Sequence, residues 1–249
     1  GNSIASGGNY NTVVGDEAGT AITTGDNNTA VGYASLSANT TGVNMTAVGY
    51  NAGLSHTTGN SSTFIGTDSG KLTTTGVGNT FVGDGSGRQN TTGASNVAIG
   101  QSALLANTTA SNNTAVGLNA LTANTTGGDN VAIGKDALDA NTTGSGNTAV
   151  GSSAGTGITT GINNTIVGGL AGDVLSDADY NVAIGHQALT SDTKGGSAVA
   201  VGYAALFSQN FTSSTDNYNT AVGYNAGGAV TSGTNNTLIG GLAGDAITT

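Results

Sequence analysis

Residues of the types that carry out catalysis or bind metals are few in this chain, and they share no register. The two histidines, His56 and His186, lie at different positions of the sequence repeat defined below, cysteine is absent, and no carboxylate recurs beside either histidine. General acid–base catalysis needs groups held at a defined separation, and a metal site needs several converging ligands. We therefore predict that the protein is not an enzyme and expect no catalytic residue, metal site or cofactor.

The charged residues give weaker hints of chemistry. The acid-rich turn 173–179 could bind an ion weakly, although a solvated loop is the simpler interpretation. Lys71 and Arg88 share one repeat position in adjacent repeats and form a small basic spot, which we expect to be paired with Asp68 and Asp84. No pair of carboxylates stands out as an acid and a base.

Charge and composition exclude several partners. The 249 residues contain 4 Lys or Arg and 14 Asp or Glu, which gives a net charge of −10. An acidic surface attracts neither nucleic acid nor an anionic membrane. No apolar run approaches the ~20 residues that a membrane-spanning helix needs, so we expect no membrane insertion within this segment. Both ends fall in mid-repeat, which leaves room for targeting segments, caps or anchors outside this sequence.

The elements that position these residues follow from one repeated dipeptide. Val-Gly or Ile-Gly recurs fourteen times, at steps of 17 residues except for one step of 21. A strict period of this kind indicates one small unit stacked many times. We number each repeat from this glycine, which is position 0 and which we interpret as a turn residue. The turn glycines are Gly15, Gly32, Gly49, Gly66, Gly83, Gly100, Gly117, Gly134, Gly151, Gly168, Gly185, Gly202, Gly223 and Gly240.

The repeat predicts an all-β parallel β-solenoid, or β-roll. The segment Asn-Thr-Ala-Val-Gly is rich in β-branched residues and closed by glycine, which is typical of a strand followed by a turn. Thr-Thr at positions +8 and +9 predicts a second short strand, and the frequent glycines argue against a helix. We expect a single repeat domain over residues 1–249, with about 14 coils stacked about 4.8 Å apart. Stacked Asn at −4 and Thr at −3, +8 and +9 are expected to form side-chain ladders.

Positions +4 and +7 vary together in a way that indicates packing between coils. Position +4 is either Leu or Gly, and every Leu copy carries a polar residue at +7. Five of the eight Gly copies instead carry an aliphatic residue at +7. The simplest explanation is one interior slot that is filled from either position, because close packing disfavours both overfilling and a void.

Two neighbouring apolar columns point to opposite sides of the strand. Position −1 is always Val or Ile, so we assign it to the coil interior. Position −2 is then external, although it too is always apolar, and we predict a chain–chain interface there. The predicted core is Val14, Val31, Val48, Ile65, Val82, Ile99, Val116, Ile133, Val150, Val167, Ile184, Val201, Val222 and Ile239. The predicted interface residues are Val13, Ala30, Ala47, Phe64, Phe81, Ile166 and Leu238. A cover by the chain's own turn is the alternative, and a trimer is the simplest oligomer.

The motif Asn-Thr-Ala-Val-Gly-Tyr-x-Ala resembles the head repeats of trimeric autotransporter adhesins of the YadA type. It occurs from Asn219 to Ala226, and with Ser in the last place from Asn28 to Ser35. It is equally similar to repeats in phage tail-fibre and other bacterial surface proteins. The resemblance implies a left-handed β-roll that forms a homotrimer outside a cell or virion, and it brings no catalytic residues. The adhesin repeat is typically shorter, and this sequence contains no stalk, neck, anchor or chaperone domain.

Two irregular features remain. Twelve Asn-x-Ser/Thr sequons occur, including Asn39, Asn107, Asn124 and Asn141; they would mark exposed turns if glycosylated, but stacked Asn and Thr generate the same pattern. The 21-residue step contains a four-residue insertion within residues 207–218. An insertion in a solenoid projects as a loop, often on a binding face, so Phe207, Phe211 and Tyr218 form a candidate contact loop. Rings folded over the coil are the alternative.

These observations favour a structural segment of an extracellular fibre or surface appendage, which supplies length, stiffness and a repetitive surface. Its partner would be itself, as a homotrimer, an end-to-end fibre or both. The alternative is an adhesin head that touches a host surface or a glycan. A third interpretation is an ice-binding solenoid, but this needs a Thr array that points one way. Since −3 is assigned to the interior with −1, and Thr at +8 and +9 point apart, the sequence disfavours it.

Overall fold

The computed structural model describes residues 7–249, which form a parallel β-solenoid of about 13 turns with a repeat of about 17 residues. These residues contain strands and turns but no helix, so the predicted all-β class and the predicted period are confirmed. Contacts divide the chain into two compact units, residues 1–126 and 127–249, and each unit is described by itself.

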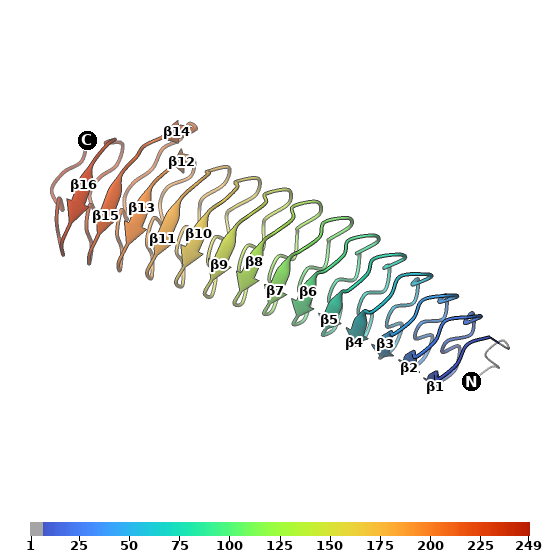
Figure 1. The fold of residues 1–249 in the computed structure, drawn as a ribbon. Coiled ribbons are helices and arrows are strands. Elements are labelled where there is room, and N and C mark those ends of the chain that lie inside the picture. Colours follow the sequence, from blue (N-terminus) through green and yellow to red (C-terminus); the bar gives the residue numbers. More distant parts are fainter. Residues whose placement is uncertain (1–6) are drawn as a thin grey trace. The chain divides into compact units, whose positions relative to one another are not determined.

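Each coil contributes one strand of three residues that ends directly before the repeat glycine. Neighbouring strands within a unit are parallel, and equivalent residues lie side by side, as Thr29 does with Thr46 (Figure 1). The first unit contains β1 (Thr12–Val14), β2 (Thr29–Val31), β3 (Thr46–Val48), β4 (Thr63–Ile65), β5 (Thr80–Val82), β6 (Val97–Ile99) and β7 (Thr114–Val116). The second contains β8 (Val131–Ile133), β9 (Thr148–Val150), β10 (Thr165–Val167), β11 (Val182–Ile184), β13 (Val199–Val201), β15 (Thr220–Val222) and β16 (Thr237–Ile239).

The second strand that was predicted at the Thr-Thr segment is wrong in every described coil. Backbone bonds still join the coils there, since the amide of Thr23 donates to the carbonyl of Thr40 at 2.9 Å, but the segment is bent. In the described chain, the only additional strands are β12 (Gly195–Gly196) and β14 (Thr215–Asp216), which pair in parallel beside the insertion (Figure 1).

The assignment of the two apolar columns is reversed in the structure. Position −2 faces the interior: Ala30, Phe64 and Ile166 are fully buried, and only Val13 and Leu238, in the outermost described coils, are half-buried. Position −1 faces outward, and the exposed fraction is 41% at Ile99 and 38% at Ile184. The physical reason is the limited space inside the narrow coil. The interior accepts mainly Ala at −2, so the larger Val and Ile at −1 lie on the outside. The fourteen predicted core residues from Val14 to Ile239 are therefore not the core, and the predicted interface residues are interior.

The interior slot exists, and the chain fills it in three ways. Leu36 at +4 and Ile158 at +7 are both fully buried, as the sequence predicted. The third way is Phe at −2, in the repeats of Phe64 and Phe81. Phe64 also fills the space at Gly53 of the preceding coil, so two rings account for the three repeats that have Gly at +4 without an aliphatic residue at +7. A Cβ at Gly70 would lie 2.5 Å from the ring of Phe64, and one at Gly87 would lie 2.5 Å from the ring of Phe81. The two phenyl rings stack with their centroids 5.5 Å apart.

Backbone conformation explains why +4 is restricted to Leu and Gly. This position lies in the left-handed region in every type of coil, with φ of 48° at Leu36 and 56° at Gly19. Gly adopts this conformation freely, whereas Leu must offset strain of about 1–2 kcal/mol. Burial of a Leu side chain contributes about 1.5–3 kcal/mol, which is enough to offset that strain.

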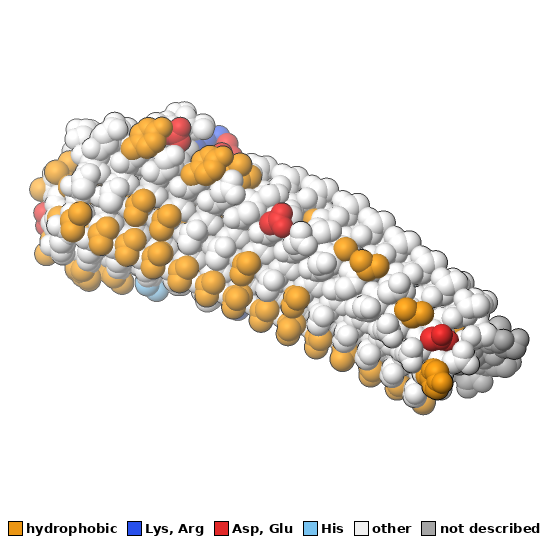
Figure 2. Space-filling model, viewed as in Figure 1, with side chains coloured by type: hydrophobic (Ala, Val, Ile, Leu, Met, Phe, Trp, Pro, Cys, Tyr) orange, Lys and Arg blue, Asp and Glu red, His pale blue; other side chains and the backbone are white. Residues whose placement is uncertain are grey.

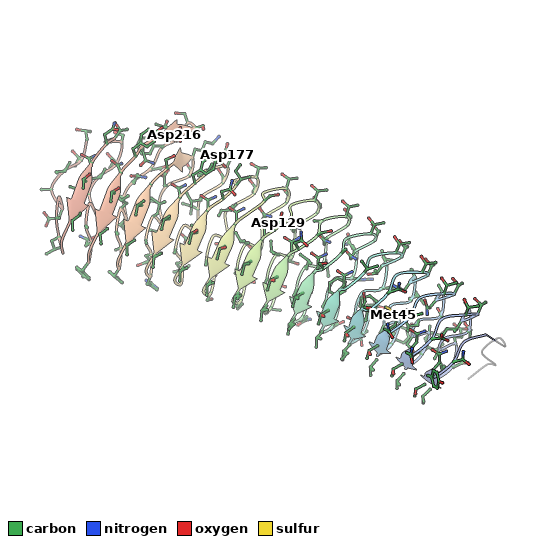
Figure 3. All side chains as sticks on the ribbon, viewed as in Figure 1. Met45, Asp129, Asp177 and Asp216 are labelled. Atoms are coloured by element: carbon green, nitrogen blue, oxygen red, sulfur yellow. The ribbon has the colours of Figure 1, made fainter. Side chains whose placement is uncertain are left out.

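Asparagine at −4 ties each coil to the next, mainly through the backbone. Direct side-chain bonds of the predicted kind also form in this column, from Asn164 to Asn147 at 3.0 Å and from Asn236 to Asn219 at 3.1 Å. The side chain of Asn28 donates to the carbonyl of Gly42 at 2.9 Å and accepts the amide of Met45 at 2.9 Å. Met45 is a buried exception in this column (Figure 3). Its sulfur lies 3.4 Å from the amide of Ser62, where other coils offer an amide oxygen. Direct side-chain ladders form at +7, as between Asn107 and Asn90 at 2.7 Å.

Candidate functional surface

The outward columns at −3 and −1 form a regular face in each unit. Position −3 is Thr in ten repeats and Val in four, and −1 is Val or Ile in all fourteen, so neither column contains a charge. Most side chains at both positions are half-buried, and they reach solvent along every strand. Figure 2 shows the resulting row of hydrophobic side chains. We call the −3 and −1 columns the outer face.

Aromatic residues at +1 flank the outer face in part of each unit. Tyr33 and Tyr50 stack with centroids 5.3 Å apart in the first unit. In the second unit, His186 stacks on Tyr203 at 5.8 Å, and Tyr203 stacks on Tyr224 at 5.3 Å. These stacks were not predicted from the sequence, although the shared position in successive repeats was the signal that could have revealed them. They extend the apolar surface beyond the strands.

The histidines are far apart in the chain and have different surroundings. His186 is exposed at +1, as expected for an isolated surface histidine. His56 is instead fully buried at +7, and neither ring nitrogen has a hydrogen-bond partner. Burial lowers the pKa of His56 to about 4, and the nearby backbone of Gly76 opposes this shift without reaching hydrogen-bond geometry. A buried neutral imidazole without a polar partner is poorly placed for catalysis.

Asp68 holds the small basic spot predicted at Lys71 and Arg88. Its carboxylate lies 3.2 Å from the ammonium of Lys71 and 3.5 Å from the guanidinium of Arg88, so one acid serves both cations. Burial acts to raise the pKa of Asp68, but bonds from Asn51 and Lys71, together with the two positive charges, outweigh it and lower the pKa. The pairing expected at Asp68 is confirmed, whereas the pairing expected at Asp84 is wrong, because Asp68 holds both cations.

The acid-rich turn 173–179 uses its carboxylates within the protein. Asp173 accepts from the hydroxyl of Thr190, Asp177 lies 3.6 Å from Lys194, and Asp179 accepts the amide of Ile162 at 2.8 Å. Across residues 7–249, no three His, Cys, Asp or Glu side chains come together as a metal site, and the same residues enclose no pocket.

Glycosylation is disfavoured at the sequons named from the sequence. Asn39, Asn107, Asn124 and Asn141 lie at +7 and are all fully buried. The carbonyl oxygen of the Asn39 side chain accepts the amide of Gly42, and its amide group donates to the carbonyl of Gly42. A sugar on such an asparagine would have to displace the coil interior.

The insertion is fixed by a buried polar network rather than by free aromatics. One oxygen of Asp192 accepts the amides of Gly195 at 2.9 Å and Phe211 at 3.0 Å. The other accepts from Gln209 at 2.7 Å, and Gln209 in turn accepts from Asn219 at 2.8 Å. The insertion supplies the Phe211 amide, and aspartate can accept it where the asparagine of other coils would present a donor.

The candidate contact loop is therefore only partly correct. Phe211 is buried, with 8% of its surface exposed, because its ring folds over the coil. Phe207 and Tyr218 remain exposed, at 36% and 57%. Tyr180, which was not singled out from the sequence, is equally exposed at 55%. Its position, which in most repeats is Asn, Ser, Gly or Asp, was the signal that was overlooked.

The comparisons with known proteins add no family. No protein-family model matches the chain, and no curated protein or solved structure shows significant similarity to it. The likeness to adhesin and tail-fibre repeats therefore remains a prediction from the motif. No helix in the described part of the chain is long and apolar enough to cross a membrane.

Proposed function

We propose that this chain is a structural repeat segment of an extracellular fibre or surface appendage, and that it associates with copies of itself through the outer face. The observation that supports this most directly is the aliphatic column at −1. The interior is filled by the residues at −2, by the slot and by the buried Ala or Ser at +3, such as Ala18 and Ser35. The core therefore does not need fourteen additional Val or Ile residues. Monomers rarely expose long apolar stripes, and such stripes typically mark interfaces.

A second copy fits this face better than an unrelated partner because both share one period. Equivalent side chains recur about every 4.8 Å along a stacked sheet, so an in-register copy matches every coil. We propose a homotrimer, the assembly that the motif resemblance implies, and end-to-end growth would extend it into a fibre. Its role is then length, stiffness and repetition at a cell or virion surface, without enzymatic activity. The alternative is an adhesin head of the same architecture that contacts a host surface or a glycan.

Light scattering of purified protein tests the self-association. We expect the measured mass to be that of an oligomer, such as three times the 23.7 kDa of one chain. The double substitution Ile65→Lys and Ile99→Lys places charge on the outer face, where the side chains are already solvent-accessible, and should yield monomer. The matched control, Thr41→Lys and Thr75→Lys, changes exposed residues away from this face and should leave the mass unchanged. A wild-type monomer at micromolar concentration would contradict the proposal. Electron microscopy of native material then separates filaments from discrete trimers.

Ice binding is a second candidate, because the structure removes the main objection to it. Thr at −3 and Val or Ile at −1 point outward together, for example at Thr29 and Val31. The outer face thus presents hydroxyl and methyl groups in a regular, uncharged array. A thermal hysteresis assay decides the matter: activity that is lost in the Ile65→Lys and Ile99→Lys variant would favour ice over self-association, and no hysteresis would exclude it.

A further inference from the structure

Two exposed tyrosines of the second unit have a backbone conformation that bulky residues rarely adopt. Tyr180 and Tyr218 occupy position −5 with φ of 59° and 53°. Elsewhere this position is Asn, Ser, Gly or Asp, apart from Tyr10. Asn, Asp and Gly tolerate left-handed backbone, whereas a bulky side chain in that region is an outlier. Strain of this kind concentrates at functional sites.

The two tyrosines belong to coils two steps apart, with small residues between them. Two steps correspond to roughly 10 Å, and the middle coil carries Gly196 and Ser197 at the same place. A Cβ at Gly196 would lie 3.0 Å from the carbonyl of Asp179 and 3.2 Å from the carboxylate of Asp216. Each tyrosine is thus accompanied by an aspartate, and glycine and serine separate the two pairs.

Asp216 is the last residue of β14 and is labelled in Figure 3, and Figure 2 shows large hydrophobic side chains next to acidic ones on this part of the second unit. Both carboxylates are oriented by hydrogen bonds. Asp179 accepts the amide of Ile162 at 2.8 Å, and Asp216 accepts the hydroxyl of Ser197 at 2.9 Å, each through one oxygen. The second oxygen of each carboxylate has no hydrogen-bond partner in the described chain. Half-buried Asp179 and exposed Asp216 therefore each keep an acceptor oxygen available, one or two residues before an exposed tyrosine.

This combination fits a sugar better than other ligands. Aromatic faces pack against the C–H faces of pyranose rings, and carboxylates accept hydrogen bonds from their hydroxyl groups. The nearest cation, Lys194, is already paired with Asp177 at 3.6 Å. An acidic surface without a free cation disfavours anionic glycans and nucleic acid. We propose that Tyr180, Tyr218, Asp179 and Asp216 bind a neutral oligosaccharide that crosses Gly196 and Ser197.

This binding site is separate from the outer face, since it uses position −5 rather than −3 and −1. It would give the adhesin alternative a specific location, and it does not depend on self-association. A variant that loses sugar binding but stays oligomeric, or one that becomes monomeric but still binds sugar, therefore distinguishes this proposal from self-association through the outer face.

The test titrates the full chain with a panel of tetrasaccharides: cellotetraose, chitotetraose, maltotetraose and mannotetraose. Saturation-transfer NMR should detect saturable binding of at least one. Tyr180→Asn and Tyr218→Asn should each weaken that binding by about tenfold or more, the loss expected when a central aromatic contact is removed. Because Asn is the commonest residue at −5, both variants should unfold at the same temperature as the wild type or above it. A merely structural role for the tyrosines would not separate binding from stability in this way.

Tyr10→Asn is the matched control. Tyr10 has the same repeat position and a φ of 58°, but the coil two steps further carries Asn44 instead of a second tyrosine. Its substitution should leave tetrasaccharide binding unchanged. The proposal is overturned if no tetrasaccharide binds, if the two variants bind as the wild type does, or if a hexalysine peptide occupies this site in preference to the sugars.

Discussion

His56 shows how a single residue can make the coil sensitive to acid. The imidazole occupies the +7 position, where Asn39 of the preceding coil satisfies both the amide and the carbonyl of Gly42. No such bonds form at His56, whose ring packs against Phe64 at 6.0 Å between centroids. The side chain is tolerated there only while it is neutral.

We therefore expect the free energy of unfolding to fall as the pH falls from about 6.5 toward 4. Burial holds the pKa of His56 at about 4, against 6.5 for the free side chain, so the unfolded chain binds a proton that the folded chain excludes. The difference between the two pKa values corresponds to about 3 kcal/mol in the free energy of unfolding. This contribution is fully present above pH 6.5 and is lost by pH 4. Chemical denaturation at several pH values measures it.

His56→Asn should abolish this pH dependence and add hydrogen bonds to Gly59. His186→Asn is the control, since His186 is exposed and its replacement should leave the pH profile unchanged. A profile that survives in His56→Asn would place the acid sensitivity elsewhere.

At the scale of one coil, the repeat glycine at position 0 is the residue with the least freedom. Gly100 has a φ of 132°, and a Cβ there would lie 2.5 Å from the carbonyl oxygen of Gly117. Both the conformation and the close approach of the next coil require glycine. Gly78 also has a positive φ, of 65°, but a Cβ added there would lie 3.9 Å from its nearest neighbouring atom.

Gly100→Ala should consequently destabilise the protein by more than about 3 kcal/mol, because it combines backbone strain with a steric clash. Gly78→Asn should change stability by less than about 0.5 kcal/mol, since Asn is common at −5 and space is available. Urea denaturation of both variants provides the comparison. Equal effects would show that positive φ alone, and not the approach of the next coil, limits these positions.

The slot between coils gives a second prediction at this scale. Leu36→Gly should cost about 2–5 kcal/mol through the cavity that it leaves, and Asn39→Ile should also destabilise the protein by overpacking. The double variant should recover most of the loss, because it copies the Gly and Ile arrangement of Gly19 and Ile22. A double-mutant cycle measures the coupling, which we expect to be about 2 kcal/mol or more.

Leu36→Gly combined with Asn107→Ile, which lies in a distant coil, provides the control. The effects of that pair should add, because the residues share no slot. Additivity within the Leu36 and Asn39 pair would contradict the slot model.

The sequence predicted the period, the turn glycines and the shared slot, because each of them leaves a trace in every repeat. It could not decide which of −1 and −2 faces inward, since a three-residue strand with two apolar neighbours looks the same from either side. Residue size was the usable signal: Phe64 and Phe81 appear only where +4 is Gly. The shared repeat position of Tyr180 and Tyr218 was also hidden, because the insertion interrupts the 17-residue register between them.

For the whole molecule, net charge and apolar surface act in opposite directions. The chain carries −10, and each of its four cations is paired with an aspartate, so the excess negative charge belongs to acids without a cation. Copies that meet through uncharged outer faces still repel one another at longer range. Self-association is therefore expected to depend on ionic strength.

We expect association to strengthen between 0.01 M and 0.15 M salt, because the Debye length falls from about 30 Å to about 8 Å. Sedimentation velocity at several salt concentrations measures this trend. An assembly that dissociates as salt rises would mean that ion pairs, rather than the outer face, hold the copies together.

The filling of interior space by Phe64 and Phe81 limits how such a chain can evolve. Phe64 occupies the space beside Gly53 and Gly70, and Phe81 occupies the space beside Gly87. Coils that carry their own Leu or Ile could be duplicated or lost singly without leaving a void. The coils of Gly53 and Gly70 cannot be separated in this way, because Phe64 of the second coil also fills the space of the first. They would have to be inherited together, which makes this stretch the least interchangeable part of an otherwise modular sequence.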